Sequence, residues 1–423
     1  MNILISAYDC NPEYGSDSYI AWSYITNLSK YCKIFVLTKT DNKQDIENYF
    51  KVNEFPYKKN IQFIYIDRVQ GIERIMYKVS EQFGVLAEYV RWQKPAYEKA
   101  KQLMDKQDID ICHHVTLDDF RCVGKLWKLD IPFVFGPAGG GQETPKCLLS
   151  YLKNHLKVEY IRKIINCISV RMPNYKKGME KASRIYSSND ETTKMYKKSI
   201  KAKEYSKIQR LTELSISEDY LREREDLNKG TNNKVLIISS GRLMPRKGIS
   251  LLIDAANEIC TSVPYCIEIY GEGEEKDTLQ KKVDLLKLND RVKICGNIPF
   301  DKMQQKYKEA DIFVLPSLRE STGTAVFEAL ANKLPVITLN QNGAKYIVEN
   351  DAGILVDIKN KQQIIHDMAS SITKLIEDSK LRIKLGEKGF EKIYDKYTWE
   401  KRAKYMTNIY KEILLEKNKY CRE

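Results

Sequence analysis

Two glutamates flank a Ser-Thr-Gly-Thr turn in the stretch RESTGTAVFE, residues 319–328. A carboxylate accepts two hydrogen bonds, which matches the vicinal hydroxyls of a ribose or a hexose. The apolar run DIFVLPS just before the turn predicts a strand. We therefore expect Glu320 in a loop and Glu328 in the helix that follows, where both can face one ligand. The alternative is a pair of acids placed near a helix start because the helix dipole favours them.

The turn between the glutamates predicts an anion-binding helix start. Gly323 permits a sharp turn, and Thr322 or Thr324 would cap the helix AVFEALANK. The backbone amides of Gly323, Thr324 and Ala325 would then point at a phosphate or a sugar.

A second motif, GRLMPRKG, follows the apolar run KVLIISS. Arg242 and Lys247 lie in it, just before a predicted helix, and Arg246 is a spare cation. Two cations beside a helix N-terminus are suited to a diphosphate. The alternative is a basic surface loop without a ligand.

Three features of the first half are further candidates. Gly15 and Ser16 occupy the turn after the first apolar run, and the segment IPFVFGPAGGGQETP allows close backbone approach by a ligand at Gly139, Gly140 and Gly141. Flexible turns are the alternative for both. The run IDICHH places His113 and His114 at a predicted strand end, and alternation lets only one of them face a ligand. The alternative for either residue is a structural histidine whose hydrogen bonds are satisfied within the protein.

Strands and helices alternate along both halves of the chain, which predicts two Rossmann-like sheets. The predicted strands are residues 2–7, 33–38, 61–66, 109–114, 131–136 and 184–188, then 234–240, 265–271, 291–296, 311–316, 334–339 and 353–356. Each motif above follows such a strand. Because ligands of parallel sheets bind beyond the carboxyl ends of the strands, two such domains would face their loops into a central cleft.

The polar stretch at residues 215–233 ends in a Gly-Asn-rich turn and predicts an interdomain linker. We expect an N-terminal acceptor-binding domain over residues 1–214 and a C-terminal nucleotide-sugar-binding domain over residues 234–397. A last helix, residues 398–423, would pack back on the first domain.

Together, GRLMPRKG, YGEGEE and PSLRESTGTAVFEALANKLPVI resemble the retaining nucleotide-sugar glycosyltransferases of family four, over about residues 2 to 410. The resemblance implies the GT-B architecture, an α/β fold of two doubly wound Rossmann-like domains. It implies that Arg242 and Lys247 hold the donor diphosphate, that Glu328 binds the ribose and that Glu320 contacts the transferred sugar. The family commonly has an aromatic residue where this chain has Thr322.

The same resemblance extends to the first half. It places Gly15 and Ser16 against the diphosphate and a histidine, His113 or His114, at the donor sugar or acceptor. Gly139 to Gly141 would bind acceptor or sugar, as in a polysaccharide-synthesis branch of the family. We therefore expect a hexosyltransferase for cell-surface polysaccharide, with a UDP-sugar as the favoured donor and a saccharide or lipid-linked acceptor.

The charge of the chain is uneven. Its formal net charge is +13, and residues 146–210 contain seventeen Lys or Arg against five Asp or Glu. Such a segment can attract nucleic acid, an acidic substrate or an anionic membrane. The alternative is a solvated basic surface without a partner. No zinc finger or RNP motif accompanies it, so we expect a cytoplasmic enzyme docked on the inner membrane face. The alternatives are another GT-B enzyme, such as an epimerase or phosphorylase, and a basic nucleic-acid-binding or scaffold protein.

Neither a metal nor a resident cofactor is expected. The ten cysteines include no CxxC pair, and the one Asp-x-Asp, Asp108 to Asp110, begins a predicted strand at the end away from the ligand. No apolar run reaches the roughly 18 residues that cross a bilayer. The first residues lack the basic segment of a secretory leader.

Overall fold

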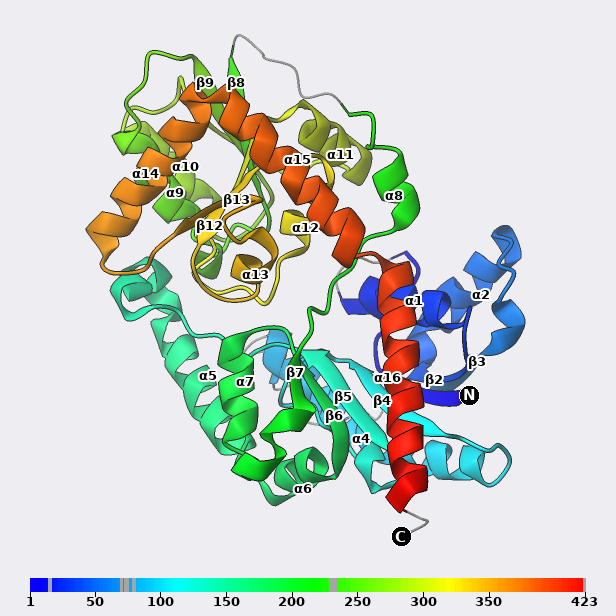
Figure 1. Cartoon of the computed structure of the whole chain (residues 1–423). Helices are drawn as coiled ribbons and strands as arrows, with labels where there is room; N and C mark the ends of the chain where they lie inside the picture. Colours follow the sequence, from blue (N-terminus) through cyan, green and yellow to red (C-terminus); the bar gives the residue numbers. More distant parts are fainter. Residues whose placement is uncertain (14–16, 69–70, 72–75, 78–80, 228–233, 421–423) are drawn as a thin grey trace. The chain divides into compact units, whose positions relative to one another are not determined.

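The chain folds into two compact units in a computed structural model (Figure 1). The structure describes all residues except 14–16, 69–70, 72–75, 78–80, 228–233 and 421–423. The first unit comprises Met1–Gly141, Ile164–Ser215 and Trp399–Glu423, and the second comprises Gln142–Lys163 and Ile216–Thr398. Each unit contains one parallel sheet with helices packed on it.

The sheet of the first unit has seven strands in the order β3-β2-β1-β4-β5-β6-β7. The strands are β1 (Asn2–Ala7), β2 (Lys33–Lys39), β3 (Ile61–Ile66), β4 (Ile111–Thr116), β5 (Phe133–Ala138), β6 (Ala182–Ser187) and β7 (Ile208–Arg210). The helices are α1 (Asp17–Leu28), α2 (Lys43–Val52), α4 (Glu81–Met104), α6 (Pro173–Lys181), α7 (Asp190–Lys197) and α16 (Trp399–Tyr420). A further helix, α5 (Leu156–Ser169), is divided between the units, since its residues up to Lys163 group with the second unit and those from Ile164 with the first.

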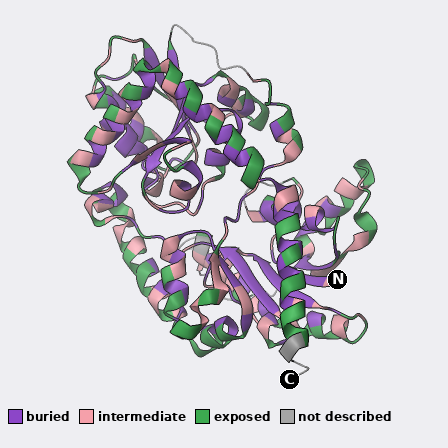
Figure 2. Ribbon diagram, in the orientation of Figure 1, coloured by how far each residue is buried: buried purple, intermediate pink, exposed green. Residues whose placement is uncertain are grey.

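The strands of the first unit are apolar because helices cover both faces of the sheet. Every residue of β4 and β5 is buried, as Figure 2 shows for the centre of the sheet. On one face Leu4 and Phe135 pack with Tyr89 of α4. The face of β4 that carries His113 is covered by α1 and α16, since its ring contacts those of Tyr24 and Tyr410.

The sheet of the second unit has six strands in the order β10-β9-β8-β11-β12-β13. They are β8 (Val235–Ser240), β9 (Tyr265–Tyr270), β10 (Val292–Gly296), β11 (Ile312–Leu315), β12 (Val336–Leu339) and β13 (Gly353–Val356). The helices are α8 (Glu218–Arg222), α9 (Ile249–Glu258), α10 (Lys276–Leu285), α11 (Phe300–Glu309), α12 (Thr324–Ala331), α13 (Ala344–Val348), α14 (Lys361–Glu377) and α15 (Ser379–Lys396).

Both strand orders are those of doubly wound Rossmann-like sheets, so the predicted fold class is confirmed. All twelve predicted strands occur, each within about two residues of its expected bounds. The three-residue strand β7 was not predicted, because it is too short to show a periodic pattern. The central cleft expected between the two domains stays a prediction.

The two units are not contiguous in sequence, unlike the expected domains. Residues 142–163, expected in the first domain, group with the second unit, where Leu148 and Leu152 join the core. Tyr151 of this segment donates a hydrogen bond from its hydroxyl to Asp254 Oδ2 at 2.6 Å. Apolar residues every three to four positions therefore attach the segment of residues 142–163 to the second unit, beside α9.

The stretch expected as a linker also belongs partly to the second unit, since residues from Ile216 group with it. Thr398 ends this unit, and α16 belongs to the first. Two ion pairs attach α16 there: Lys30 Nζ lies 2.5 Å from Glu400, and Arg184 Nη2 lies 2.6 Å from Glu416.

Candidate functional site

The motif GRLMPRKG forms the loop that follows β8, and this loop is locked to the loop after β11. Gly248 adopts a left-handed φ of 69°, and a Cβ built there would lie 2.1 Å from the carbonyl oxygen of Pro316. Only glycine fits such a close approach. The amide of Leu318 donates to the carbonyl of Arg246 at 2.9 Å. Two motifs separated by some seventy residues therefore meet at the carboxyl edge of the sheet.

The meeting point of these loops is an ion cluster around Glu320. Lys247 donates a short hydrogen bond from Nζ to Glu320 Oε2, and Arg246 Nη1 lies 3.9 Å from the same oxygen. Burial alone would raise the pKa of the Glu320 carboxyl, but Lys247 and Arg246 outweigh it and hold that pKa below its ordinary value. Glu320 is therefore ionised at neutral pH, although only 15% of its side chain is exposed.

Arg319 is a further cation near Glu320, and it was not among the predicted site residues. Its pKa is lowered to about 9, by burial and then by the nearby charge of Arg162. Its Nη2 lies 3.7 Å from Glu159 Oε2. The residue adjoins Glu320 in sequence, but an arginine in a loop carries no signal of burial until the fold is known. The site is therefore richer in positive charge than predicted.

The helix α12 begins directly after the turn, as predicted, but its cap differs. Gly323 is the N-cap residue, with a φ of 91°, and no side chain caps the helix. The expected cap by Thr322 or Thr324 is therefore wrong. Thr322 is wholly buried, and Thr324 is exposed. The first amides of α12, beside Ala325, therefore have no hydrogen bond from a capping side chain.

Glu328 lies in α12 in surroundings opposite to those of Glu320. It is hydrogen-bonded to Tyr307, and its pKa is raised because burial outweighs the effects of Tyr307 and Arg224. The hydroxyl of Tyr307 also lies 2.8 Å from Ser240 Oγ, at the end of β8. This chain of contacts links Glu328 to the end of the central strand.

A buried polar network lies behind Glu328. Arg224, which follows α8, donates to Asn332 Oδ1 at 3.1 Å and to Gln304 Oε1 at 3.2 Å. Its guanidinium lies 3.4 Å from the ring centre of Tyr220. The network joins α8, α11 and α12, so it fixes the helix that carries Glu328. Sequence reasoning missed it, because Arg224 stands in the stretch expected as a linker.

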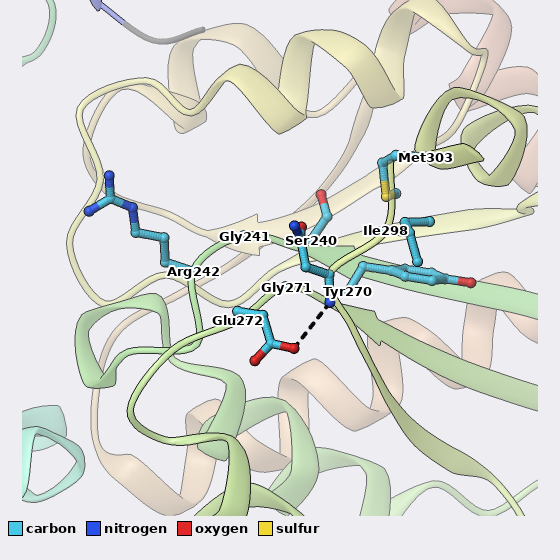
Figure 3. Close-up of a pocket in the computed structure, with 9 residues that line it drawn as sticks. Ser240, Gly241, Arg242, Tyr270, Gly271, Glu272, Ile298 and Met303 are labelled. Atoms are coloured by element: carbon cyan, nitrogen blue, oxygen red, sulfur yellow. Dashed lines mark hydrogen bonds between the residues drawn. The ribbon is translucent and has the colours of Figure 1, made fainter. Parts of the chain in front are cut away.

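A pocket of about 380 Å³ lies at the carboxyl ends of β8, β9 and β10 (Figure 3). Its lining residues are Ser240, Gly241, Arg242, Tyr270, Gly271, Glu272, Asn297, Ile298 and Met303. The wall is mixed: Ile298 and Met303 are apolar, and the amide of Asn297 donates to Glu272 Oε1 at 3.4 Å. The side chain of Arg242 points away from Tyr270 and Met303 in Figure 3.

The histidine pair lies in the core of the first unit rather than at a strand end. β4 extends to Thr116, so both histidines are internal to the strand and buried. His113 Nε2 bonds the carbonyl of Gly136, and its Nδ1 bonds the hydroxyl of Tyr410.

His114 is held on the opposite face of the same strand. Its Nε2 lies 2.8 Å from the carbonyl oxygen of Leu117, and its Nδ1 lies 3.3 Å from the hydroxyl of Tyr89. Burial lowers the pKa of His113 to about 3 and that of His114 to about 4. Both ring nitrogens of each residue already have protein partners, so this geometry favours a structural role for both.

The glycine segment after β5 has internal partners for two of its amides. Gly139 N donates to the carbonyl of Asp118 at 2.7 Å, and Gly141 N donates to Thr192 Oγ1 at 3.1 Å. A Cβ on Gly141 would lie 2.6 Å from the Cα of Thr192, so the close approach is to α7. Gly140 is partly exposed, with a φ of 99°. Ligand binding by Gly139, Gly140 and Gly141 stays a prediction, and Gly15 and Ser16 lie outside the described residues.

The described residues contain no group of three or more His, Cys, Asp or Glu that could hold a metal ion. Asp110 lies at the amino end of β4, where its Oδ2 accepts from the amide of Asn2 at 2.7 Å. Within the same part of the chain, no helix has the length and apolarity that a bilayer span requires.

Comparison with known families identifies the part of the chain that contains these loops. Residues 221–392 match the family model described as Glycosyl transferases group 1. The matched residues lie in the second unit and make up less than half of the chain. This similarity agrees with the expected glycosyltransferase class of enzyme. The matched segment includes both glutamates, the basic loop and the pocket of Figure 3.

Curated relatives agree with this assignment. The uncharacterized glycosyltransferase MJ1607 of Methanocaldococcus jannaschii is 30% identical over 181 residues, which are 43% of this chain and 45% of that protein. A second one from the same organism, MJ1178, is 25% identical over 331 residues, or 75% of this chain and 80% of that protein. The match spans about half the length of MJ1607, and about half the length of a further relative, the glycosyltransferase LpsE of Rhizobium meliloti.

Solved structures resemble the chain from end to end. Sucrose-phosphate synthase from Thermosynechococcus elongatus has a TM-score of 0.65 at 16% identity and covers 98% of this chain and 99% of its own. HepE from Anabaena, in complex with UDP, has a TM-score of 0.60 at 15% identity and covers 97% of this chain and 100% of its own. At these identities the likeness shows the fold alone, and it confirms the GT-B fold class.

Proposed function

We propose that this chain is a retaining glycosyltransferase that moves a sugar from a nucleoside diphosphate to a saccharide or a lipid-linked acceptor. The observation that carries the proposal is the cluster at the carboxyl edge of the second sheet. Lys247 and Glu320 pair there beside the uncapped start of α12. A cation, a carboxylate and a helix N-terminus in one place suit a ligand that carries both phosphate and hydroxyl groups.

The donor is oriented by the second unit in this proposal. Its base enters the pocket between Gly241 and Met303, and its diphosphate lies on Lys247 and Arg242. Glu328, linked to the pocket through Tyr307 and Ser240, accepts hydrogen bonds from the ribose hydroxyls. The transferred sugar then lies next to the ionised Glu320.

The reaction exchanges one bond at the anomeric carbon of the donor sugar. The acceptor hydroxyl oxygen forms a bond to that carbon while the bond to the diphosphate oxygen breaks. The acceptor proton passes to the departing diphosphate, on the same face of the sugar, so the configuration is retained. Lys247 and the start of α12 stabilise the negative charge that grows on the leaving diphosphate, and such electrostatic help contributes ~10² to 10³ in kcat.

UDP is the favoured nucleotide, and polysaccharide synthesis is the favoured context. The UDP complex of HepE supports the nucleotide, since that protein shares the fold. One relative, 27% identical over 183 residues, is the lipopolysaccharide core biosynthesis glycosyltransferase LpsE of Rhizobium meliloti, which supports a cell-envelope glycan. We infer that the enzyme works in the cytoplasm at the inner membrane face, without a metal or a resident cofactor.

A thermal-shift panel of UDP-, GDP- and ADP-sugars tests the proposal. We expect a UDP-sugar to raise the melting temperature of the wild-type protein, and we expect Lys247→Ala and Glu328→Ala to abolish most of that rise. Glu320→Ala should keep the rise and lose transfer, since Glu320 contacts the sugar rather than the nucleotide. Lys380→Ala, an exposed lysine on α15, is the matched control.

Only the ligand-induced shift counts in this panel, because Lys247→Ala removes the partner of Glu320 and lowers the melting temperature of the free protein as well. No shift with any nucleotide sugar would sink the proposal. A shift accompanied by epimerised donor, or by phosphorolysis in the presence of phosphate, would replace transfer by the corresponding alternative reaction.

A further inference from the structure

The helix α5 presents an apolar stripe to the solvent. Its exposed residues follow helical spacing and lie within one side of the helix, because positions three, four and seven apart share a face. The members and their exposed fractions are Val158 (40%), Tyr160 (58%), Ile161 (47%), Ile164 (59%) and Ile168 (58%). The side chain of Met172, three residues after the end of the helix, is exposed as well.

The inward side of α5 is polar, which reverses the usual pattern of a surface helix. Arg162 is 3% exposed, and it donates to the carbonyl of Gln142 and, at 2.9 Å, to Glu159 Oε1. Asn166 is also buried, and its Nδ2 donates to the carbonyl of Gly140 at 3.3 Å. These bonds fix the rotation of the helix about its axis. The apolar stripe therefore faces outward by construction, not because a loosely attached helix has turned.

Exposed basic residues lie on α5 and follow it along the chain. Lys157 lies among the apolar residues, and Arg171 lies one turn beyond Ile168. Further exposed lysines follow on α6, at Lys176 and Lys177. Lys163 is exposed as well, and it pairs with Glu143 at 2.9 Å. An outward apolar stripe set among cations is complementary to a surface that is anionic at its face and apolar beneath.

We propose that the outward stripe of α5 is the docking surface for an anionic lipid bilayer. The helix lies flat in the interface, with Ile161, Ile164 and Ile168 at the acyl boundary and the basic side chains at the lipid phosphates. Fourteen residues extend only about 21 Å, which suits lying in the plane rather than crossing it. The proposal deepens the membrane part of the proposed function, on which it rests for the reason to visit a membrane.

The test is co-sedimentation with vesicles of phosphatidylcholine containing phosphatidylglycerol. The double variant Ile164→Ser/Ile168→Ser changes two exposed positions, so its fold should be unaffected. We expect its partition onto these vesicles to fall about tenfold or more, because each isoleucine loses the burial of its side chain in lipid. The matched control is Leu285→Ser/Leu415→Ser, two leucines that are 80% and 63% exposed outside the stripe. It should bind as the wild type does.

A second measurement places the helix in the bilayer. Ile164→Trp should give a tryptophan emission that shifts to the blue with anionic vesicles and is quenched by brominated lipid, and raising the salt should weaken the binding. Equal binding of the double variant and the wild type, or equal loss in the leucine control, would overturn the proposal. So would loss of a dimer rather than of vesicle binding, since the stripe would then be a contact between two copies of the chain.

The outcome is separable from that of the proposed function. The stripe variants should keep the full thermal shift with UDP-sugar, because the donor site uses other residues. Vesicle binding without any nucleotide-induced shift would leave the docking surface intact and reject the transferase. A nucleotide-induced shift without vesicle binding would do the reverse.

Discussion

At the scale of single residues, Glu320 and Glu328 have the same charge but opposite environments. Cations lower the pKa of Glu320, whereas burial raises that of Glu328. A carboxylate held ionised by a lysine can accept a hydrogen bond at neutral pH. The ionised form of a carboxyl whose pKa is raised, such as Glu328, is stabilised by a ligand that donates hydrogen bonds to it. The free protein is therefore less stable for keeping Glu328 as a carboxylate.

The variant Glu328→Gln tests separately the effect of this carboxylate on fold stability and its effect on ligand affinity. The folded pKa is above the ordinary value of 4.5, so ionisation of Glu328 destabilises the fold at higher pH and no longer does so below pH 4.5. We expect the variant to unfold at a higher urea concentration than the wild type at pH 8, with a smaller difference at pH 4.5. Its affinity for UDP should fall about tenfold or more, because a charged acceptor for the ribose is lost. A variant less stable at pH 8, or with unchanged UDP affinity, would contradict this.

The sequence predicted the glutamates of the site but not their neighbours. The Glu-x7-Glu spacing, the strand before it and Gly323 are visible in one stretch of ten residues. Tyr307 and Arg224 act on Glu328 from α11 and from beyond α8, far away in sequence. Nothing in a single sequence pairs them, because the contact arises only when the helices pack. The threonine cap failed for a local reason, since Gly323 itself takes the cap position.

At the scale of elements, β4 holds two neutral histidines in a core. The predicted strand stopped at His114, but the structure extends it to Thr116, and this shift of two residues moves both side chains inward. The hydroxyl of Tyr410 on α16 then bonds His113, and that of Tyr24 on α1 lies 3.2 Å from Tyr410. Strand boundaries are the least certain part of a sequence-based assignment, and here the boundary decided the interpretation of the residues.

The histidine pair predicts a pH dependence of folding. Each folded pKa is lowered, to about 3 and about 4, so only the unfolded chain binds these protons below its ordinary value of 6.5. Stability is fully present above pH 6.5 and falls as the pH drops below it, by about 1.4 kcal/mol per pH unit for each histidine. We expect His113→Gln to be less stable than the wild type at pH 7.5 but to lose stability less steeply between pH 6.5 and 5. Urea unfolding at three pH values measures this, and parallel curves would refute it.

At the scale of the whole molecule, the sequence predicted two α/β units but not how the chain is shared between them. Alternating strands and helices are a local pattern, and they gave nearly every strand. Membership of residues 142–163 depends on which core Leu148, Tyr151 and Leu152 enter, and both cores consist of apolar residues that a local pattern cannot tell apart. The predicted boundaries assumed contiguous domains, which the chain does not have.

Because residues 142–163 pack in the second unit, a cavity made in this segment should destabilise the second unit. Leu152→Ala removes a side chain that is 1% exposed, and we expect it to cost about 2 to 5 kcal/mol. In amide hydrogen exchange of the intact protein, the loss of protection should fall on α9 in the second unit. Met179→Ala, a buried position of the first core, is the control and should loosen α6 and its strands instead. Loss of protection on α6 and α7 in the Leu152→Ala variant would contradict the assignment.

The close contact between Gly248 and Pro316 also limits which residues of the second unit can change. A backbone that meets Pro316 at van der Waals limits leaves no room for change in the loop that carries Lys247. Ile298 and Met303 line the pocket from segments beyond β10, outside that loop. If the proposed function holds, point changes at Ile298 and Met303 would alter which base is accepted, while the loop that carries Lys247 would stay as it is. The preference for a donor base could therefore change without a change in the loop that carries Lys247.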